Sequence, residues 1–109
     1  MKVAIIGSRS IEKIDFALAN VQEGDEIVTG GARGVDSLAE KEARKNGQGV
    51  IVFKPDYEKY GRAAPHVRNR LIVGECDRLV AFWDGVSKGT ESVIRYAEKH
   101  GTAVQIIKV

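Results

Sequence analysis

The residues in this sequence best suited to bind a ligand form a glycine-rich stretch, Gly30–Asp36, which reads Gly-Gly-Ala-Arg-Gly-Val-Asp. A β-branched apolar run precedes this stretch, and apolar residues at helical spacing follow it. Backbone N–H groups in such a strand-to-helix turn can converge on an anion, and the helix dipole adds positive potential. Arg33 contributes a planar guanidinium that suits phosphate. The spacing matches neither the Walker pattern nor GxGxxG, so a tight turn with a solvated Arg33 is the alternative to a phosphate-binding loop.

Two other loops carry similar residues. Gly7–Ser10 follows the first apolar run, and there the Ser8 hydroxyl and the Arg9 guanidinium can hold phosphate or ribose oxygens. Asp84–Thr90 ends in Gly89-Thr90 at the start of a helical pattern, which is a second candidate anion site. In both loops the alternative is that the hydroxyl only caps the helix that follows.

Polar residues in two predicted helices are further candidates. Asp36 falls in the first turn after the glycine-rich stretch, where it either contacts a ligand hydroxyl or complements the helix dipole. The densest polar cluster on a predicted amphipathic helix consists of His66, Arg68, Asn69 and Arg70. The alternative to ligand contact is that these residues form the solvent-exposed face of a surface helix. Arg68 and Asn69 are the members that we expect to reach a ligand. His66 has no second histidine nearby, which gives little support to a metal site or a catalytic base.

Short apolar runs alternate with helical patterns along the chain. The predicted strands are Lys2–Ile6, Asp25–Thr29, Val50–Phe53, Asp77–Trp83 and Ala103–Ile107. The predicted helices span Ile11–Val21 before Gly24, Val35 to Asn46-Gly47, Pro65 to about Cys76, and a Thr90 cap to Gly101. Lys54–Ala64 has no clear period and is predicted to be a loop.

This alternation predicts a single α/β domain over residues 1–109, a doubly wound Rossmann-like domain. The expected sheet is five-stranded and parallel, in the order 3-2-1-4-5, with helices on both faces. Such sheets bind ligands at the carboxyl ends of the strands, where the strand order reverses. The three loops meet at this edge. The predicted ligand-binding residues are Gly7, Ser8, Arg9, Gly30, Gly31, Ala32, Arg33, Gly34, Asp36, Arg68, Asn69, Asp84, Ser87, Gly89 and Thr90.

The composition narrows the class of protein. The chain has 109 residues, of which 43% are hydrophobic and 29% charged, as is typical of a soluble globular domain. Seventeen basic and 15 acidic residues give a net charge of +2, which argues against a strongly electropositive nucleic-acid surface. Cys76 is alone, so no disulfide framework or multi-cysteine metal site is expected. Without an apolar run of membrane-spanning length or a signal peptide, we expect a cytoplasmic protein.

Four motifs in register resemble the SLOG superfamily of Rossmann-like nucleotide-ligand proteins over nearly the whole chain. They are Gly7-Ser8-Arg9, Gly30–Asp36, Arg68-Asn69-Arg70 and Gly85–Thr90. Tyr60–Ala64 and Trp83-Asp84-Gly85 are similar to the YspA-like branch of that superfamily. The resemblance implies a site for a nucleotide-derived ligand, similar to NAD or ADP-ribose. It assigns no metal and no certain cofactor, and it implies a homodimer or larger homo-oligomer, to which Tyr57 and Tyr60 add modest support.

Two related families imply other functions. His66-Val67-Arg68 and Gly89-Thr90 resemble the Lonely-Guy phosphoribohydrolases, which cleave the N-glycosidic bond of nucleoside monophosphates. Their catalytic glutamate lies three residues after the threonine, where this chain has Val93. In an enzyme of this type, Arg68 would hold phosphate, and Asp84 or Glu91 would supply the carboxylate.

The DNA-processing protein A family is the second relative. It has stretches similar to Ala32-Arg33-Gly34 followed by Asp36, and to Arg68–Ile72, and it acts on single-stranded DNA. A net charge of only +2 does not favour nucleic-acid binding. We therefore rank a ligand-binding module or sensor first, a nucleotide hydrolase second and a DNA-binding protein third.

Overall fold

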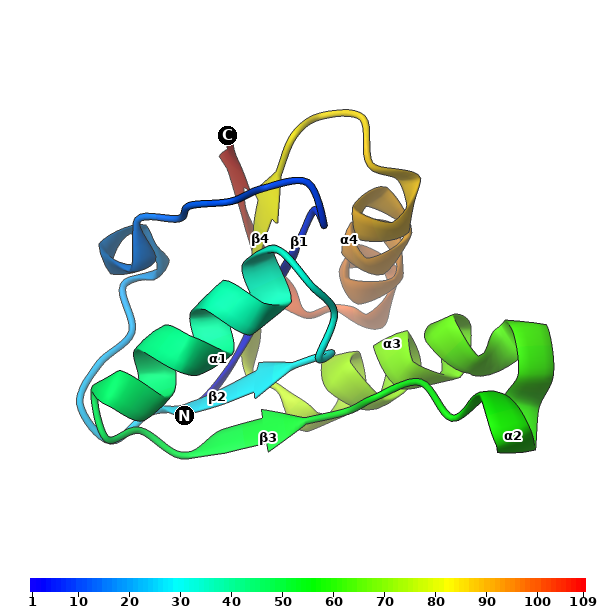
Figure 1. Ribbon diagram of the computed structural model, residues 1–109, viewed down its shortest axis with the longest axis horizontal. Helices are drawn as coiled ribbons and strands as arrows, with labels where there is room; N and C mark the ends of the chain where they lie inside the picture. Colours follow the sequence, from blue (N-terminus) through cyan, green and yellow to red (C-terminus); the bar gives the residue numbers. More distant parts are fainter.

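Five parallel strands run through the centre of the computed structural model, which describes all residues 1–109 (Figure 1). They are β1 (Lys2–Gly7), β2 (Glu26–Thr29), β3 (Val50–Val52), β4 (Arg78–Trp83) and β5 (Ala103–Lys108). Their order across the sheet is β3-β2-β1-β4-β5, and every pairing is parallel, which confirms the predicted fold class and strand order.

Helices cover both faces of this sheet. The α-helices are α1 (Val35–Lys45), α2 (Tyr57–Tyr60), α3 (Ala64–Glu75) and α4 (Lys88–His100), and two 3-10 turns are η1 (Phe16–Ala19) and η2 (Gly61–Ala63). Figure 1 shows α1 on one side of the sheet, with α3 and α4 on the other. No helix of the chain combines the length and apolar character that a membrane span requires.

The alternation of side chains along each central strand divides the core into two layers. In β1, Val3 and Ile5 pack under α1, while Ala4 and Ile6 pack under α3 and α4. Successive side chains of a strand point to opposite faces, so a strand buried on both faces is apolar throughout. Strands are added towards one edge of the sheet from β1 to β3 and towards the other edge from β4 to β5. The crossover connections therefore diverge between β1 and β4, which leaves a crevice at the carboxyl ends of these two strands.

The predicted helix over Ile11–Val21 is wrong. This segment forms only η1, which begins where the Asp15 carboxylate accepts a hydrogen bond from the Ala17 N–H and ends at Asn20, with φ at 52°. Ile11 is buried and Ile14 is partly buried against the α1 side of the core, so their apolar spacing serves a covering loop.

This loop is held by hydrogen bonds from side chains of the sheet and not by the backbone hydrogen bonds of a helix. The Arg78 guanidinium donates to the carbonyls of Ala19 and Asn20, and the Gln105 amide donates to the Leu18 carbonyl.

Three smaller predictions are also corrected. Lys54–Ala64 is not all loop, because the Asp56 side chain accepts from the Lys59 N–H and starts α2. The apolar spacing of the helix that begins at Pro65 predicts that Leu71 is buried, but Leu71 is 50% exposed because Ile72 and Val73 fill the buried face of α3. The cap of α4 is Ser87 rather than Thr90, which lies buried inside the first turn.

The glycine-rich stretch packs against the end of β1 at Gly34. This residue has φ at +79°, and a Cβ there would lie 2.5 Å from the Ser8 carbonyl oxygen and 2.6 Å from that of Arg9. Backbone atoms cannot move aside as a flexible side chain can. Only glycine therefore lets the two loops approach this closely.

We expect Gly34→Ala to lower the free energy of unfolding by about 3 kcal/mol or more, because it adds a backbone clash to an unfavourable φ. Gly47→Ala is the matched control: Gly47 has a similar φ of +74°, but no atom lies within 4 Å of its added Cβ. We expect about 1 kcal/mol there. Chemical denaturation of both variants measures the difference, and equal losses would contradict close packing at Gly34.

Candidate functional site

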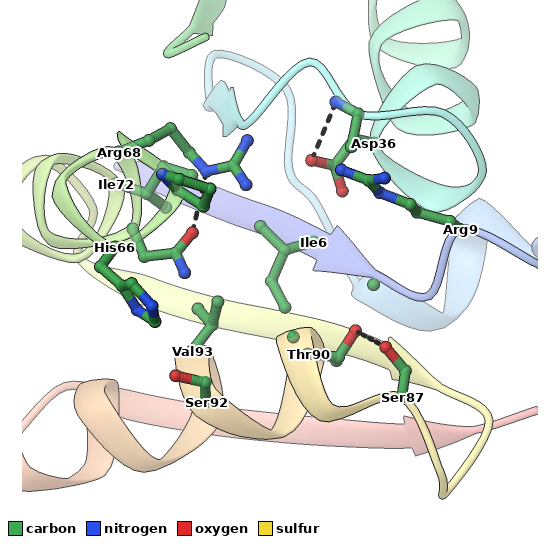
Figure 2. A pocket seen from close by; sticks show the side chains of 15 residues that line it. Ile6, Arg9, Asp36, His66, Arg68, Ile72, Ser87, Thr90, Ser92 and Val93 are labelled. Carbon is green, nitrogen blue, oxygen red and sulfur yellow. Dashed lines mark hydrogen bonds between the residues drawn. The ribbon is translucent and has the colours of Figure 1, made fainter. Parts of the chain in front are cut away.

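A cavity of about 420 Å³ opens at the carboxyl end of β1, between α3, α4 and the glycine-rich stretch (Figure 2). Its volume falls in the range of about 300–1,000 Å³ that is typical of small-molecule sites. The lining residues are Ile6, Gly7, Arg9, Ala32, Asp36, Pro65, His66, Arg68, Asn69, Ile72, Ser87, Gly89, Thr90, Ser92 and Val93. The cavity therefore lies where the reversal of strand order predicts a ligand site.

The first turn of α4 forms one wall. Asp84 shapes the loop before this turn, because its Oδ1 accepts hydrogen bonds from the N–H groups of Val86 (2.9 Å) and Ser87 (2.7 Å). These bonds hold the pKa of Asp84 below its usual range. The N–H groups of residues 88–90 find no acceptor within the chain, and Gly89 leaves open space where a side chain would stand. Free N–H groups at the positive end of a 13-residue helix favour an anion.

Two hydroxyls stand beside these N–H groups. The Ser87 and Thr90 hydroxyl oxygens are 3.2 Å apart and share one hydrogen bond, as Figure 2 shows. Each hydroxyl has one hydrogen, so one of the two oxygens donates to the other and the second keeps a hydrogen for another acceptor. The wall can thus offer both N–H and O–H donors to a ligand.

Asp36 faces the cavity from the first turn of α1. Its side chain is only 4% exposed, and its Oδ2 accepts hydrogen bonds from Gly30 N–H (3.1 Å) and Ala32 N–H (3.4 Å). Burial raises the pKa of Asp36 to about 6, although the N–H donors and the charge of Arg68 act in the opposite direction. Near neutral pH the group is therefore mostly ionised, but at an energetic cost.

Arg68 reaches the cavity from α3. Its Nε donates to the Asn69 side-chain oxygen (2.8 Å) and its Nη1 donates to the Gly30 carbonyl (2.7 Å), while Nη2 makes no hydrogen bond within the chain. Burial lowers the pKa of Arg68, and Asp36 opposes that effect. A Cβ on Gly30 would lie 2.7 Å from Nη1, so glycine at this position makes room for the guanidinium.

Arg9 supplies a second positive charge. It is exposed, lies on the loop after β1, and lines the cavity without an internal ion pair. With Arg68 and the ionised Asp36, the cavity carries an excess of positive charge. An anionic ligand meets both arginines and the helix terminus on entering.

The structure brings nine of the 15 predicted ligand-binding residues to the cavity wall. These are Gly7, Arg9, Ala32, Asp36, Arg68, Asn69, Ser87, Gly89 and Thr90. Six others do not line it, namely Ser8, Gly30, Gly31, Arg33, Gly34 and Asp84. Most of these six shape the wall from behind: the Ser8 hydroxyl accepts from the Asp84 N–H, and Gly30 and Gly34 make room for neighbouring groups. Arg33 is exposed outside the cavity.

Sequence reasoning missed five residues of the wall, most of them apolar. Ile6, Pro65, Ile72, Ser92 and Val93 line the cavity but were assigned to the core or left unassigned. The helical spacing could have predicted two of them, because Pro65 and Ile72 share a helix face with Arg68 and Asn69. His66, which gave little support to a metal site or catalytic base, also lies on this wall. Trp83 lies outside it and donates from Nε1 to the Ser87 carbonyl (3.0 Å).

The two carboxylates considered for glycosidic cleavage lie outside the cavity. Glu91 is on the outer side of α4 and pairs with Arg95 at 3.0 Å. Both oxygens of Asp84 accept hydrogen bonds, from Val86 and Ser87 N–H and from the Ser10 hydroxyl. Asp36 is the one carboxylate on the wall. No group of three or more His, Cys, Asp or Glu residues is placed to hold a metal ion.

Sequence comparison finds a related phage protein. The chain is 36% identical over 84 residues to Gene 61 protein of Mycobacterium phage D29, a match that covers 72% of this chain and 67% of the phage protein. The chain belongs to the same family as Gene 61 protein. No family model matches the chain, and no solved structure matches it. The name of the phage protein states no activity, so this kinship by itself assigns none.

Because the native pKa of Asp36 lies above the ordinary 3.8, the folded chain binds a proton more tightly than the unfolded chain. This contribution to stability is fully present below about pH 4 and is lost as the pH rises through about 6. Asp36→Asn keeps an oxygen acceptor for Gly30 and Ala32 and has no charge to desolvate. We expect the variant to gain on the order of 2–3 kcal/mol relative to the wild type between pH 4 and pH 7.5.

Urea unfolding of both proteins at each pH measures this difference. Because the two chains share every other titratable group, the contributions of those groups cancel. A difference that stays constant from pH 4 to pH 7.5 would contradict a raised pKa for Asp36.

Proposed function

We propose that the cavity binds a nucleotide or a nucleotide-derived molecule and that the chain acts as a ligand-binding module or sensor. The observation that carries this proposal is the first turn of α4, where three N–H groups without acceptors lie beside a cavity that Arg9 and Arg68 also line. A phosphate group supplies the acceptors that these donors lack. The apolar residues Ile6, Ile72 and Val93 suit the flat face of a base.

The resemblance to the SLOG superfamily supports the same proposal. It favours an adenine nucleotide, NAD or ADP-ribose over other phosphorylated ligands. On the same resemblance we propose that the chain is a member of the YspA-like branch. The hydrolase alternative loses support because Asp84 and Glu91 lie off the cavity wall. Release of base or ribose phosphate from a nucleotide panel would reverse this ranking.

Calorimetric titration with AMP, ADP-ribose and NAD tests the proposal. We expect at least one of them to bind, and we expect Gly89→Ala to weaken that binding by about tenfold, or 1.4 kcal/mol, because a methyl group would stand beside the N–H donors. The fold tolerates this methyl group, since no atom lies within 4 Å of the added Cβ.

Gly74→Ala is the matched control. Gly74 is an exposed helical glycine of α3 with equally open space around it, and it lies outside the cavity. Both substitutions remove a helical glycine, so their effects on stability match. No binding of any of the three ligands at millimolar concentration, or equal affinities of the two variants, would refute the proposed site.

We also propose that the chain self-associates through its α2–α3 surface. Tyr57, Tyr60 and Leu71 are 57%, 39% and 50% exposed there, although such side chains are normally buried. Exposed apolar side chains that gather on one surface mark interaction sites more often than single scattered ones do, and α2 and α3 are packed against each other. The family resemblance points in the same direction.

Light scattering at high protein concentration is expected to give at least twice the mass of 11.9 kDa. Leu71→Glu should shift the mass towards that of a single chain, because a charge would be desolvated at the contact. Val86→Glu serves as the control, since Val86 is 76% exposed on a different loop. A single-chain mass for the wild type would refute self-association.

A further inference from the structure

The two ends of the cavity differ in chemistry. Figure 2 shows Arg9, Asp36, Ser87 and Thr90 at the end nearest the loop after β1, and His66 and Ile72 at the opposite end, on α3. A phosphate at the α4 terminus leaves the α3 end for the base. The sugar is the part of a nucleotide next to its phosphate, so it would lie nearer to Asp36 than the base does.

Asp36 can accept more hydrogen bonds than the chain supplies, because an ionised carboxylate has about four lone-pair sites. Its Oδ2 accepts two N–H groups, the N–H of Gly7 is a further donor that lowers its pKa, and no arginine lies close enough to form an ion pair. Asp36 is only 4% exposed, and the small exposed part lies on the cavity wall. The carboxylate therefore has a lone pair on the cavity wall that can accept a hydrogen bond from a ligand hydroxyl.

The same carboxylate excludes a phosphate from its own surroundings, because two negative groups in contact repel each other. The ligand is thus oriented by opposite requirements. Donors at the α4 terminus take the phosphate, and the acceptor at Asp36 takes a group that carries a hydrogen.

We infer that Asp36 recognises a ribose hydroxyl, so that the cavity selects ribonucleotides over deoxyribonucleotides. This inference rests on the proposed nucleotide site and specifies the class of nucleotide. Asp36 is a specificity residue, since its carboxylate accepts a hydrogen bond from the sugar and Asp36 takes part in no reaction.

The experiment compares AMP with its 2′-deoxy and 3′-deoxy analogues by calorimetric titration of the full chain. We expect one of the two deoxy analogues to bind at least about tenfold more weakly than AMP, because a hydrogen bond to a charged group is lost. The affected analogue identifies the hydroxyl. Equal affinities of all three would refute the inference while leaving the nucleotide site intact, whereas no binding of any would refute the nucleotide site.

Asp36→Asn separates recognition from support of the loop. The amide oxygen still accepts from Gly30 and Ala32, but the other position becomes an NH₂ group that cannot accept. We expect the variant to bind AMP and the affected deoxy analogue within about twofold of each other. Asp15→Asn, at the η1 cap far from the cavity, should keep the wild-type ratio. An unchanged ratio in Asp36→Asn would assign Asp36 to loop structure alone.

A measurement on the wild type does not depend on the variant folding. Arg68, Arg9 and His66 are the charged or titratable groups that share the cavity with Asp36. The phosphate ionises alike in AMP and in its deoxy analogue, so its effect cancels from the ratio of their affinities. This ratio should fall towards one as the pH drops from 7.5 to 5, where Asp36 becomes protonated. A ratio that stays constant over this range would also refute the inference.

Discussion

The wall of the cavity depends on the backbone of one residue, Gly30. Its N–H donates to Asp36 on α1 and its carbonyl accepts from Arg68 on α3. Because α1 and α3 cover opposite faces of the sheet, these two bonds join the layers over the end of β2. A side chain at Gly30 would meet both partners, at 2.7 Å from Arg68 and 2.9 Å from Asp36. The absence of a Cβ thus allows a buried acid and a half-buried base to be held by the backbone of the same residue.

This arrangement changes the interpretation of the glycine-rich stretch. The sequence suggested that Gly30, Gly31 and Gly34 bare their backbone to a ligand. In the structure, Gly30 and Gly34 make room for protein groups, whereas Gly89 at the α4 terminus leaves open space beside N–H groups without acceptors. Glycines in a loop indicate that another group packs closely against the backbone, but the sequence does not say whether that group belongs to a ligand or to another part of the chain.

The sheet could be predicted because its determinants are local. Each central strand is a short apolar run between turn residues, and the alternation of strands with helices leaves few topologies. The segment Ile11–Val21 could not be predicted in the same way. Its apolar spacing fits a helix, but the acceptors for Arg78 and Gln105 are its carbonyls, and those partners lie 58 to 87 residues away in the chain. Likewise, the polar cluster on the predicted helix suggested that Arg68 reaches a ligand, but only the fold shows that it reaches Gly30.

The cavity draws its wall from four segments, near residues 7–9, 32–36, 65–72 and 87–93, which span most of the chain. No single supersecondary unit contains the whole wall, so partial unfolding of any layer removes it. Occupancy is therefore coupled to the integrity of the entire domain, and a bound molecule stabilises all of it by mass action. If the chain is the sensor that we propose, a higher concentration of its ligand would lengthen the time for which the folded chain resists proteolysis.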